Sequence, residues 1–488
     1  MITFFVAAGI LVFGYFVYSK FVEKVFVINP DAVTPVHTKA DGVDYVPISD
    51  RKAMLIQFIS IAGTGPIFGA IQGALWGPAA FFWIVLGCVF AGATHDYMSG
   101  MLSIRQDGAT MAEMVGTYLG PIIKILCRIV MVGLLIMVAA VFTMSPADIL
   151  VTISPAGMGL SGVFPNAEPG VIARWFWIVV IITYFGIATI IPINKLIARL
   201  YPIFGAGMIL LGVGMTVALF TSGLITQIPE FSFTNPHPAG ALMFPALFIT
   251  IACGAISGFH ATQSPLMARC MSNEKGGRNV FYRAMIFEGF LALIWAAVAM
   301  TFFHGPGVNA LEGLAGAGLP AVVVSTISFA FFGTIGGVIA IICVGIFPIS
   351  TGDTALRVCR MAIADVLKID QSPVMNRLKL SLPLFAIVVV LLFVDFGILW
   401  RYFAWLNQTL AVFTLWAGAV YLAQRKLLHW ICTIPAIFMT FLTNSFILTV
   451  AHGFNLRREI GFAIAAVITI GCIAAFAKKC LLPGKSVA

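Results

Sequence analysis

Long apolar runs, separated by short polar segments, recur along the whole 488-residue chain. Each run is about 20 residues long, the length that an α-helix needs to cross the hydrocarbon core of a bilayer. The pattern predicts an all-α polytopic membrane protein with about 13 transmembrane helices. The expected spans are 2–19, 53–75, 78–98, 122–144, 171–191, 201–223, 241–264, 283–303, 320–348, 380–399, 400–422, 427–450 and 458–477.

Composition agrees with this fold class. Hydrophobic residues make up 60% of the chain and charged residues 10%, whereas a soluble domain carries about 25% charged residues. A soluble enzyme, a secreted disulfide scaffold and a disordered protein are therefore excluded. The nine cysteines form no C-x-x-C pair, so neither a zinc site nor a disulfide framework is indicated. No metal and no cofactor is predicted.

The basic residues are distributed unevenly between the predicted loops. Of the 28 Lys and Arg residues, 24 lie on one side of the predicted membrane, and four, Arg174, Arg401, Arg457 and Arg458, lie on the other. Because cytoplasmic loops carry an excess of basic residues, we expect the N-terminus outside and the C-terminus in the cytoplasm. No dense basic block is present, so the net charge of +9 does not indicate a nucleic acid partner. Lys20 and Lys24 follow the first run, the reverse of a signal peptide.

Two of the spans contain helix-breaking sequence. The second span contains Gly63, Thr64, Gly65 and Pro66, and the seventh contains 254–260 with Gly254 and Gly258. Glycine and proline are unfavourable inside helices, and backbone groups freed at membrane depth must be buried in protein or line a wet cavity. For either site alone, a packing notch is an equal alternative.

The two breaks lie five spans apart, so the two helices enter the membrane from opposite sides. This arrangement is typical of an inverted-repeat transporter whose discontinuous helices meet at the midplane. We expect a first five-helix repeat at 53–223 and a second at 241–422. An extra helix and loop at 1–52 would precede them, and two helices and a tail at 427–488 would follow. No clear residue-level repeat is visible.

Several short motifs resemble the carbon starvation protein A family of bacterial inner-membrane transporters. They are Asn29-Pro30, Thr34-Pro35, His37-Thr38, 41–47 (DGVDYVP), 61–67 (IAGTGPI), 91–96 (AGATHD), 105–109 (RQDGA), 257–261 (SGFHA) and 407–411 (NQTLA). The resemblance implies proton-driven uptake of peptides or pyruvate during carbon starvation, in the bacterial inner membrane. It also implies the broken-helix fold of the amino acid–polyamine–cation superfamily.

The breaks are the candidate substrate site. Half-helix ends at 63–66 and 254–258 expose backbone groups, and an N-terminal end suits a carboxylate, which pyruvate, amino acids and peptides carry. Thr64, Ser257 and Gln263 would add hydrogen bonds, although such residues more often join helices. His260 is a candidate gate or substrate contact, with a packing role as the alternative.

His95, Asp96 and Glu288 are the candidates for coupling to an ion, either a proton or sodium. An intramembrane carboxylate is a functional hypothesis by default. The alternatives are an interfacial cap for His95 and Asp96, and pairing of Glu288 with Arg283 or Arg278.

Three other features have less specific interpretations. Asp353 is expected to cap a short cytoplasmic helix. Asn407 and Gln408 either face the pathway or bond another helix, and segment 25–52 is either a closing element or a passive loop.

A secondary transporter is the predicted function, and the protein is not expected to be an enzyme. The chain has no Walker A sequence and no H-E-x-x-H or G-x-S-x-G motif. A membrane nutrient sensor that signals through a partner is the alternative. The oligomeric state is not predicted.

Overall fold

The computed structural model describes residues 1–40, 45–160, 163, 168–190, 193–232, 234–371 and 373–481. Residues 41–44 of the predicted motif at 41–47 therefore lie outside the described residues. Within them the fold is entirely helical and contains no strand. Ten of the described helices are long and apolar enough to cross a membrane, and a bent pair makes an eleventh span. The predicted fold class, an all-α polytopic membrane protein, is confirmed.

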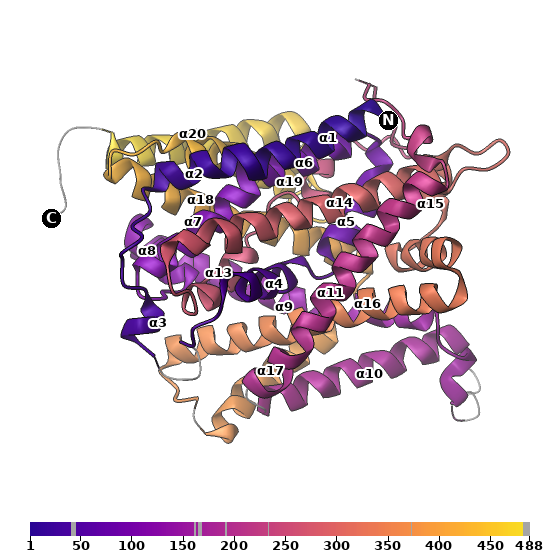
Figure 1. Cartoon of the computed structure of the whole chain (residues 1–488), viewed down its shortest axis with the longest axis horizontal. Coiled ribbons are helices and arrows are strands. Elements are labelled where there is room, and N and C mark those ends of the chain that lie inside the picture. The colour runs from indigo at the N-terminus through magenta and orange to yellow at the C-terminus, as the bar shows by residue number, and fades with distance from the viewer. Residues whose placement is uncertain are drawn as a thin grey trace.

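Helices lie at each of the 13 predicted span positions, joined by short helices and loops (Figure 1). In the first half these are α1 (Ile2–Phe13), η1 (Gly14–Tyr18), α2 (Ser19–Phe26), α3 (Pro35–Thr38), α4 (Asp50–Ala62), α5 (Gly65–Gly73), η2 (Ala74–Trp76), α6 (Ala79–Leu86), η3 (Gly87–Gly92), α7 (Ala93–Arg105), α8 (Met111–Leu119), α9 (Pro121–Val151), η4 (Ala156–Gly159), α10 (Pro169–Ile190), α11 (Ile193–Thr221) and η5 (Leu224–Gln227). The second half holds α12 (Met243–Thr250), α13 (His260–Ala268), η6 (Glu274–Gly276), η7 (Arg278–Tyr282), α14 (Arg283–Phe302), α15 (Ala310–Gly316), α16 (Pro320–Leu367), α17 (Val374–Leu391), α18 (Phe396–Gln424), α19 (Trp430–Thr449) and α20 (Arg458–Cys480).

Both predicted helix breaks are present. α4 and α5 meet at an angle of 49°, and Gly63 between them has a φ of +50°, a conformation that favours glycine. α12 and α13 are separated by the longer non-helical segment 251–259. His260, predicted to lie just past the break, is the first residue of α13.

The two broken helix pairs run in opposite directions. At one face of the molecule, which we call the α3 face, the backbone N–H of Ile48 just before α4 donates to the carbonyl of Cys270 just after α13 (3.1 Å). At the other, the α15 face, the indole of Trp76 after α5 donates to the carbonyl of Ala241 before α12 (3.0 Å). These faces are the left and right ends of the molecule in Figure 1. The antiparallel course matches the predicted five-plus-five inverted arrangement.

The helices around the breaks form the centre of the molecule. In their most apolar windows, 83% of the residues of Ala79–Arg105 and 78% of those of α18 are buried, against 17% for α17 and 22% for α20. Apolar helices with exposed sides are expected where lipid replaces water as the solvent. The central helices carry the polar residues of the candidate site.

Two sequence predictions at the second half are wrong. Asp353 does not cap a short helix, because α16 continues from Pro320 to Leu367 and holds Asp353 in its interior. A straight helix of that length would reach about 72 Å, and a kink at Gly333, with φ +64°, divides it. The predicted boundary between 380–399 and 400–422 is also displaced, since the Asp395 side chain accepts from the Ile398 N–H and starts α18 there. Hydropathy is averaged over many residues, so it does not reveal the position of a single capping residue.

Gly258 lies where the segment 251–259 touches the backbone of α18. A Cβ on Gly258 would overlap the backbone nitrogen of Ala411 and the carbonyl oxygen of Asn407. We expect Gly258→Ala to lower the free energy of unfolding in detergent by about 1–3 kcal/mol, the usual effect of overpacking. Gly186→Ala in α10 is the matched control, because a Cβ there meets no atom within 4 Å. Equal unfolding midpoints for both variants would contradict this close contact.

Candidate functional site

The two breaks face each other at the centre of the fold. A Cβ on Gly65 would overlap the side chain of Cys253, and a Cβ on Gly254 would lie 3.7 Å from the Cβ of Pro66. Further along α5, a Cβ on Gly69 would lie 3.2 Å from the carbonyl oxygen of Thr250. Small residues therefore let α5 approach the second break closely, as they do at membrane helix contacts generally.

Asn407 of α18 holds the second break in place. Its Oδ1 accepts hydrogen bonds from the Ser257 hydroxyl and from the Phe259 N–H, both at 2.8 Å, and its carbonyl accepts from the Gly258 N–H at 2.9 Å. The neighbouring Gln408 donates to the carbonyl of Phe248 at 2.7 Å. Of the two interpretations left open, bonding to another helix is the one the geometry shows.

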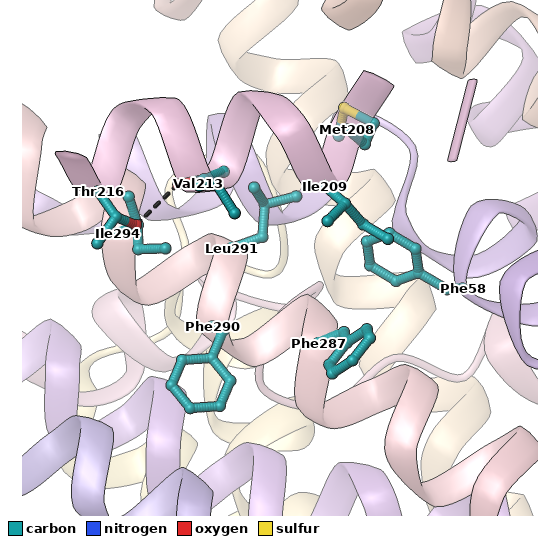
Figure 2. Close-up of a pocket in the computed structure, with 10 residues that line it drawn as sticks. Phe58, Met208, Ile209, Val213, Thr216, Phe287, Phe290, Leu291 and Ile294 are labelled. Carbon is teal, nitrogen blue, oxygen red and sulfur yellow. Dashed lines mark hydrogen bonds between the residues drawn. The ribbon is translucent and has the colours of Figure 1, made fainter. Parts of the chain in front are cut away.

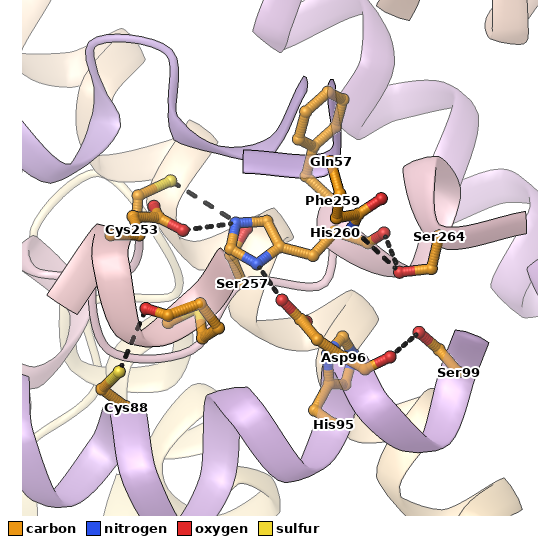
Figure 3. Close-up of polar contacts among 12 residues, drawn as sticks. Gln57, Cys88, His95, Asp96, Ser99, Cys253, Ser257, Phe259, His260 and Ser264 are labelled. Carbon is orange, nitrogen blue, oxygen red and sulfur yellow. Dashed lines mark hydrogen bonds and ion pairs between the residues drawn. The ribbon is translucent and has the colours of Figure 1, made fainter. Parts of the chain in front are cut away.

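Four titratable side chains form a buried cluster beside this break, which we call the acid–histidine cluster: His95 and Asp96 on α7, His260 on α13 and Glu288 on α14. All four are fully buried. Asp96 Oδ1 lies 2.8 Å from His95 Nδ1, and its Oδ2 lies 2.9 Å from His260 Nδ1. His260 Nε2 lies 3.4 Å from Glu288 Oε2. Figure 3 shows the His260 ring with Asp96 on one side and Cys253 on the other.

The cluster is bonded directly to the unwound backbone. Glu288 Oε1 accepts a hydrogen bond from the Gly254 N–H at 3.1 Å. Glu288 does not pair with the arginines considered as its alternative partners, since its ion-pair contact is with His260 and Arg278 lies 3.3 Å from Glu23. His95 and Asp96 are not an interfacial cap, because neither has any exposed surface.

The cluster has an unusual charge balance. Two ionised carboxylates with two neutral imidazoles would place two uncompensated negative charges away from water, which is strongly unfavourable. A proton on an imidazole or a carboxylate cancels one of these charges. The arrangement is therefore suited to holding protons at His260, which contacts a carboxylate through each ring nitrogen.

The remaining predicted residues lie around the same centre. The Thr64 hydroxyl lies 3.2 Å from the Ser145 hydroxyl on α9, and Gln263 donates to the Thr262 hydroxyl at 2.9 Å. Gln57 on α4, which the sequence interpretation missed, donates to the Ser264 hydroxyl at 3.3 Å. A glutamine inside an apolar run was the available signal for it.

Several buried polar atoms near the cluster have no hydrogen-bond partner among the described residues. They are Gln57 Oε1, His95 Nε2 and Gln263 Oε1. Buried polar atoms are nearly always paired with protein or water, and each unpaired one costs about 1–3 kcal/mol. The centre of the fold thus contains polar atoms that can form further hydrogen bonds.

An apolar groove between α11 and α14 is a poor alternative site. It has a volume of about 240 Å³ and is lined mainly by aliphatic and phenyl side chains (Figure 2). The hydroxyl of Thr216 in its wall donates to the carbonyl of Gly212 at 2.7 Å. With that hydroxyl already bonded, the groove suits an acyl chain better than a charged molecule.

The family model for carbon starvation protein CstA matches residues 1–165 and 164–312. The chain belongs to this family. An uncharacterised membrane protein of Haemophilus influenzae is 43% identical over 342 residues, which cover 63% of this chain and 92% of that protein.

Relatives of this CstA-family protein include named transporters. The pyruvate/proton symporter BtsT of Escherichia coli is 28% identical over 62% of this chain and 49% of BtsT. The peptide transporter CstA of Campylobacter jejuni is 28% identical over 67% of this chain and 54% of that transporter. The aligned part thus spans about half the length of each named transporter.

Solved structures of other transporters share the fold. MhsT in complex with L-phenylalanine superposes with a TM-score of 0.58 at 16% identity, covering 88% of this chain and 99% of MhsT. A single-residue mutant of the manganese transporter of Eremococcus coleocola gives a TM-score of 0.53 at 12% identity, covering 91% of this chain and 97% of that protein. The predicted family and inverted-repeat fold are confirmed, and the names of the relatives support transport and not the sensor alternative.

Two members of the cluster form a possible set of metal ligands together with a neighbouring cysteine. Cys253, His260 and Glu288 of this CstA-family protein offer donor atoms that all lie within 4.8 Å of one another. A thiol, an imidazole and a carboxylate form a donor set for soft or borderline metals, whereas hard cations take oxygen ligands.

The contact between Gly65 and Cys253 can be tested by compensation. We expect Gly65→Ala to lower the free energy of unfolding by about 1–3 kcal/mol, because its Cβ overlaps the Cys253 side chain. Adding Cys253→Gly removes that side chain, so the double variant should regain more stability than the two single effects predict. The measurement is a double-mutant cycle of detergent unfolding midpoints. Purely additive effects would mean that the two breaks do not touch.

Proposed function

We propose that this CstA-family protein is a secondary active transporter that imports a small carboxylate-bearing molecule, a peptide or pyruvate, together with a proton. The named relatives support the substrate classes, and the shared fold supports alternating access. The single observation that carries the proposal is the acid–histidine cluster, which is hydrogen-bonded through Glu288 to the unwound backbone opposite the first break.

The proposed substrate site lies between the breaks. Gly63, Thr64, Gly65 and Pro66 form one side, and Gly254, Ser257, Gly258, His260 and Gln263 form the other. The N-termini of α5 and α13 both begin at this centre, and helix N-termini favour anions. A substrate carboxylate there would meet two positive helix ends, while the unpaired amide oxygen of Gln263 would accept from a donor on the substrate.

The coupling step uses His260 as a bridge. A proton taken up on the Glu288 side enters at Nε2, and release from Nδ1 passes it towards Asp96 and His95. Because Glu288 also holds the Gly254 N–H, its protonation weakens an acceptor of the second break. Proton occupancy and the shape of the substrate site are thereby linked.

The proposed orientation follows the distribution of basic residues. The α3 face would be cytoplasmic and the α15 face outside, in the inner membrane of a bacterium, with the N-terminus outside. The two repeats would be 53–223 and 241–422, preceded by 1–52 and followed by 427–488.

The first test is uptake by purified protein in liposomes, with labelled pyruvate and labelled di- and tripeptides in parallel. An inward proton gradient is imposed with and without sodium. We expect concentrative accumulation that needs the proton gradient and not sodium. Folded protein that moves none of these compounds would contradict the proposal.

Glu288→Gln tests the coupling role. The amide oxygen can still accept from the Gly254 N–H, but the side chain no longer exchanges a proton. We expect proton-driven accumulation to fall at least about tenfold while substrate exchange at equal concentrations on both sides continues. The control is Glu312→Gln, in the exposed cap of α15, where glutamine also serves. Normal accumulation by Glu288→Gln would remove the carboxylate from the mechanism.

A further inference from the structure

A cavity of about 110 Å³ lies near the α3 face, between α8, α9, α13 and α16. None of its lining residues belongs to the site proposed above. Its wall includes Thr262 on α13, Arg128 on α9, Arg269 just after α13, and Asp365 near the end of α16. Its wall thus includes two half-buried arginines and one aspartate that is exposed to solvent.

The cavity adjoins the proposed substrate site. Thr262 is two residues beyond His260 on the same half-helix, and its hydroxyl accepts from Gln263, whose Oε1 is buried without a partner among the described residues. α13 packs mainly on α4 and α7, whereas α9 and α16 pack on each other. The cavity therefore separates two helix groups at the place where a substrate leaving towards the α3 face would pass.

The charges in its wall are not neutralised by direct contact. Among the described residues, no ion pair within 4.0 Å joins Asp365 to Arg128 or Arg269. Arg128 also makes no hydrogen bond to a described residue, while Arg269 is oriented by its Nε bond to the Gly108 carbonyl at 3.0 Å. Both arginines, and Glu113 nearby, act electrostatically on Asp365. Glu113 itself is engaged in the cap of α8.

We infer that this cavity is a second substrate subsite and that it selects a zwitterion, an amino acid or a dipeptide. The carboxylate would bind Arg128 and Arg269, and the ammonium group would bind Asp365. Guanidinium groups are the preferred partners of carboxylates. A keto acid such as pyruvate would engage only the arginines and leave Asp365 repelling it. The inference rests on the proposed transport function and narrows its substrate class to peptides or amino acids.

The test compares labelled alanylalanine with labelled pyruvate, in uptake by proteoliposomes and in equilibrium binding to the purified protein. Asp365→Asn should lower the uptake efficiency, Vmax/KM, for the dipeptide about tenfold, whereas that for pyruvate should rise, because the repelling carboxylate is gone. Arg128→Gln should lower it for both, and Arg128→Lys should restore part of it. Lys124→Gln is the control, because Lys124 is one turn away on α9 and does not line the cavity.

The outcomes separate the two proposals. Dipeptide uptake that is indifferent to Asp365 and Arg128 would overturn the subsite and leave the transport function standing. Uptake of pyruvate alone would also overturn it. Binding of the dipeptide that depends on Asp365 and Arg128, without uptake of either compound, would support the subsite and contradict the transport function. If the protein neither binds nor takes up the dipeptide, the zwitterion assignment is overturned. Unfolding midpoints close to wild type would show that the variants are folded.

Discussion

The unwound segment 251–259 is the constraint on which the rest of the centre depends. Backbone groups without a helical partner cannot remain unsatisfied where water is excluded. Here a side chain or backbone group from a different helix meets each of several of them: Glu288 for the Gly254 N–H, Asn407 for the Gly258 and Phe259 N–H groups, and the Trp83 indole for the Ile251 carbonyl. The break is thus shaped by helices far from it in sequence.

The Gly254 N–H is bonded to an ionisable side chain, Glu288, although a neutral side chain would have been enough to hold the backbone. An amide at position 288 would also accept from the Gly254 N–H. A carboxylate there instead requires a compensating proton or cation. His260 lies beside it and in turn contacts Asp96, which contacts His95. One chain of contacts therefore joins the buried titratable side chains of α14, α13 and α7, and each of them is costly to charge at membrane depth. A structure under selection only for stability has little reason to accept that cost.

The sequence was sufficient for the approximate positions of the helices, for both breaks and for the intramembrane placement of the Glu288 carboxylate, because hydropathy, helix propensity and the rarity of buried carboxylates are local signals. It was insufficient wherever the structure depends on a contact between two segments that are far apart in the sequence. Asn407 was visible as a polar residue, but its partners were not, and Cys253 carried no signal until its contact with Gly65 appeared. The continuation of α16 past Asp353 was missed because a polar stretch at a helix end has the same composition whether the helix stops or extends.

The two breaks are topologically equivalent but chemically unequal. The first comprises only Gly63 and Thr64 between α4 and α5, and Thr64 contacts an uncharged serine. The second is longer, its Gly254 N–H is bonded to Glu288, and His260 of the acid–histidine cluster follows directly after it. Two repeats that diverge in this way need share no residue pattern, which is consistent with the lack of a visible internal repeat. In the proposed mechanism the two breaks would therefore have different roles. The first would offer a short hinge and a helix end for the substrate, and the second, being longer and bonded to Glu288, would be the one whose shape a proton changes.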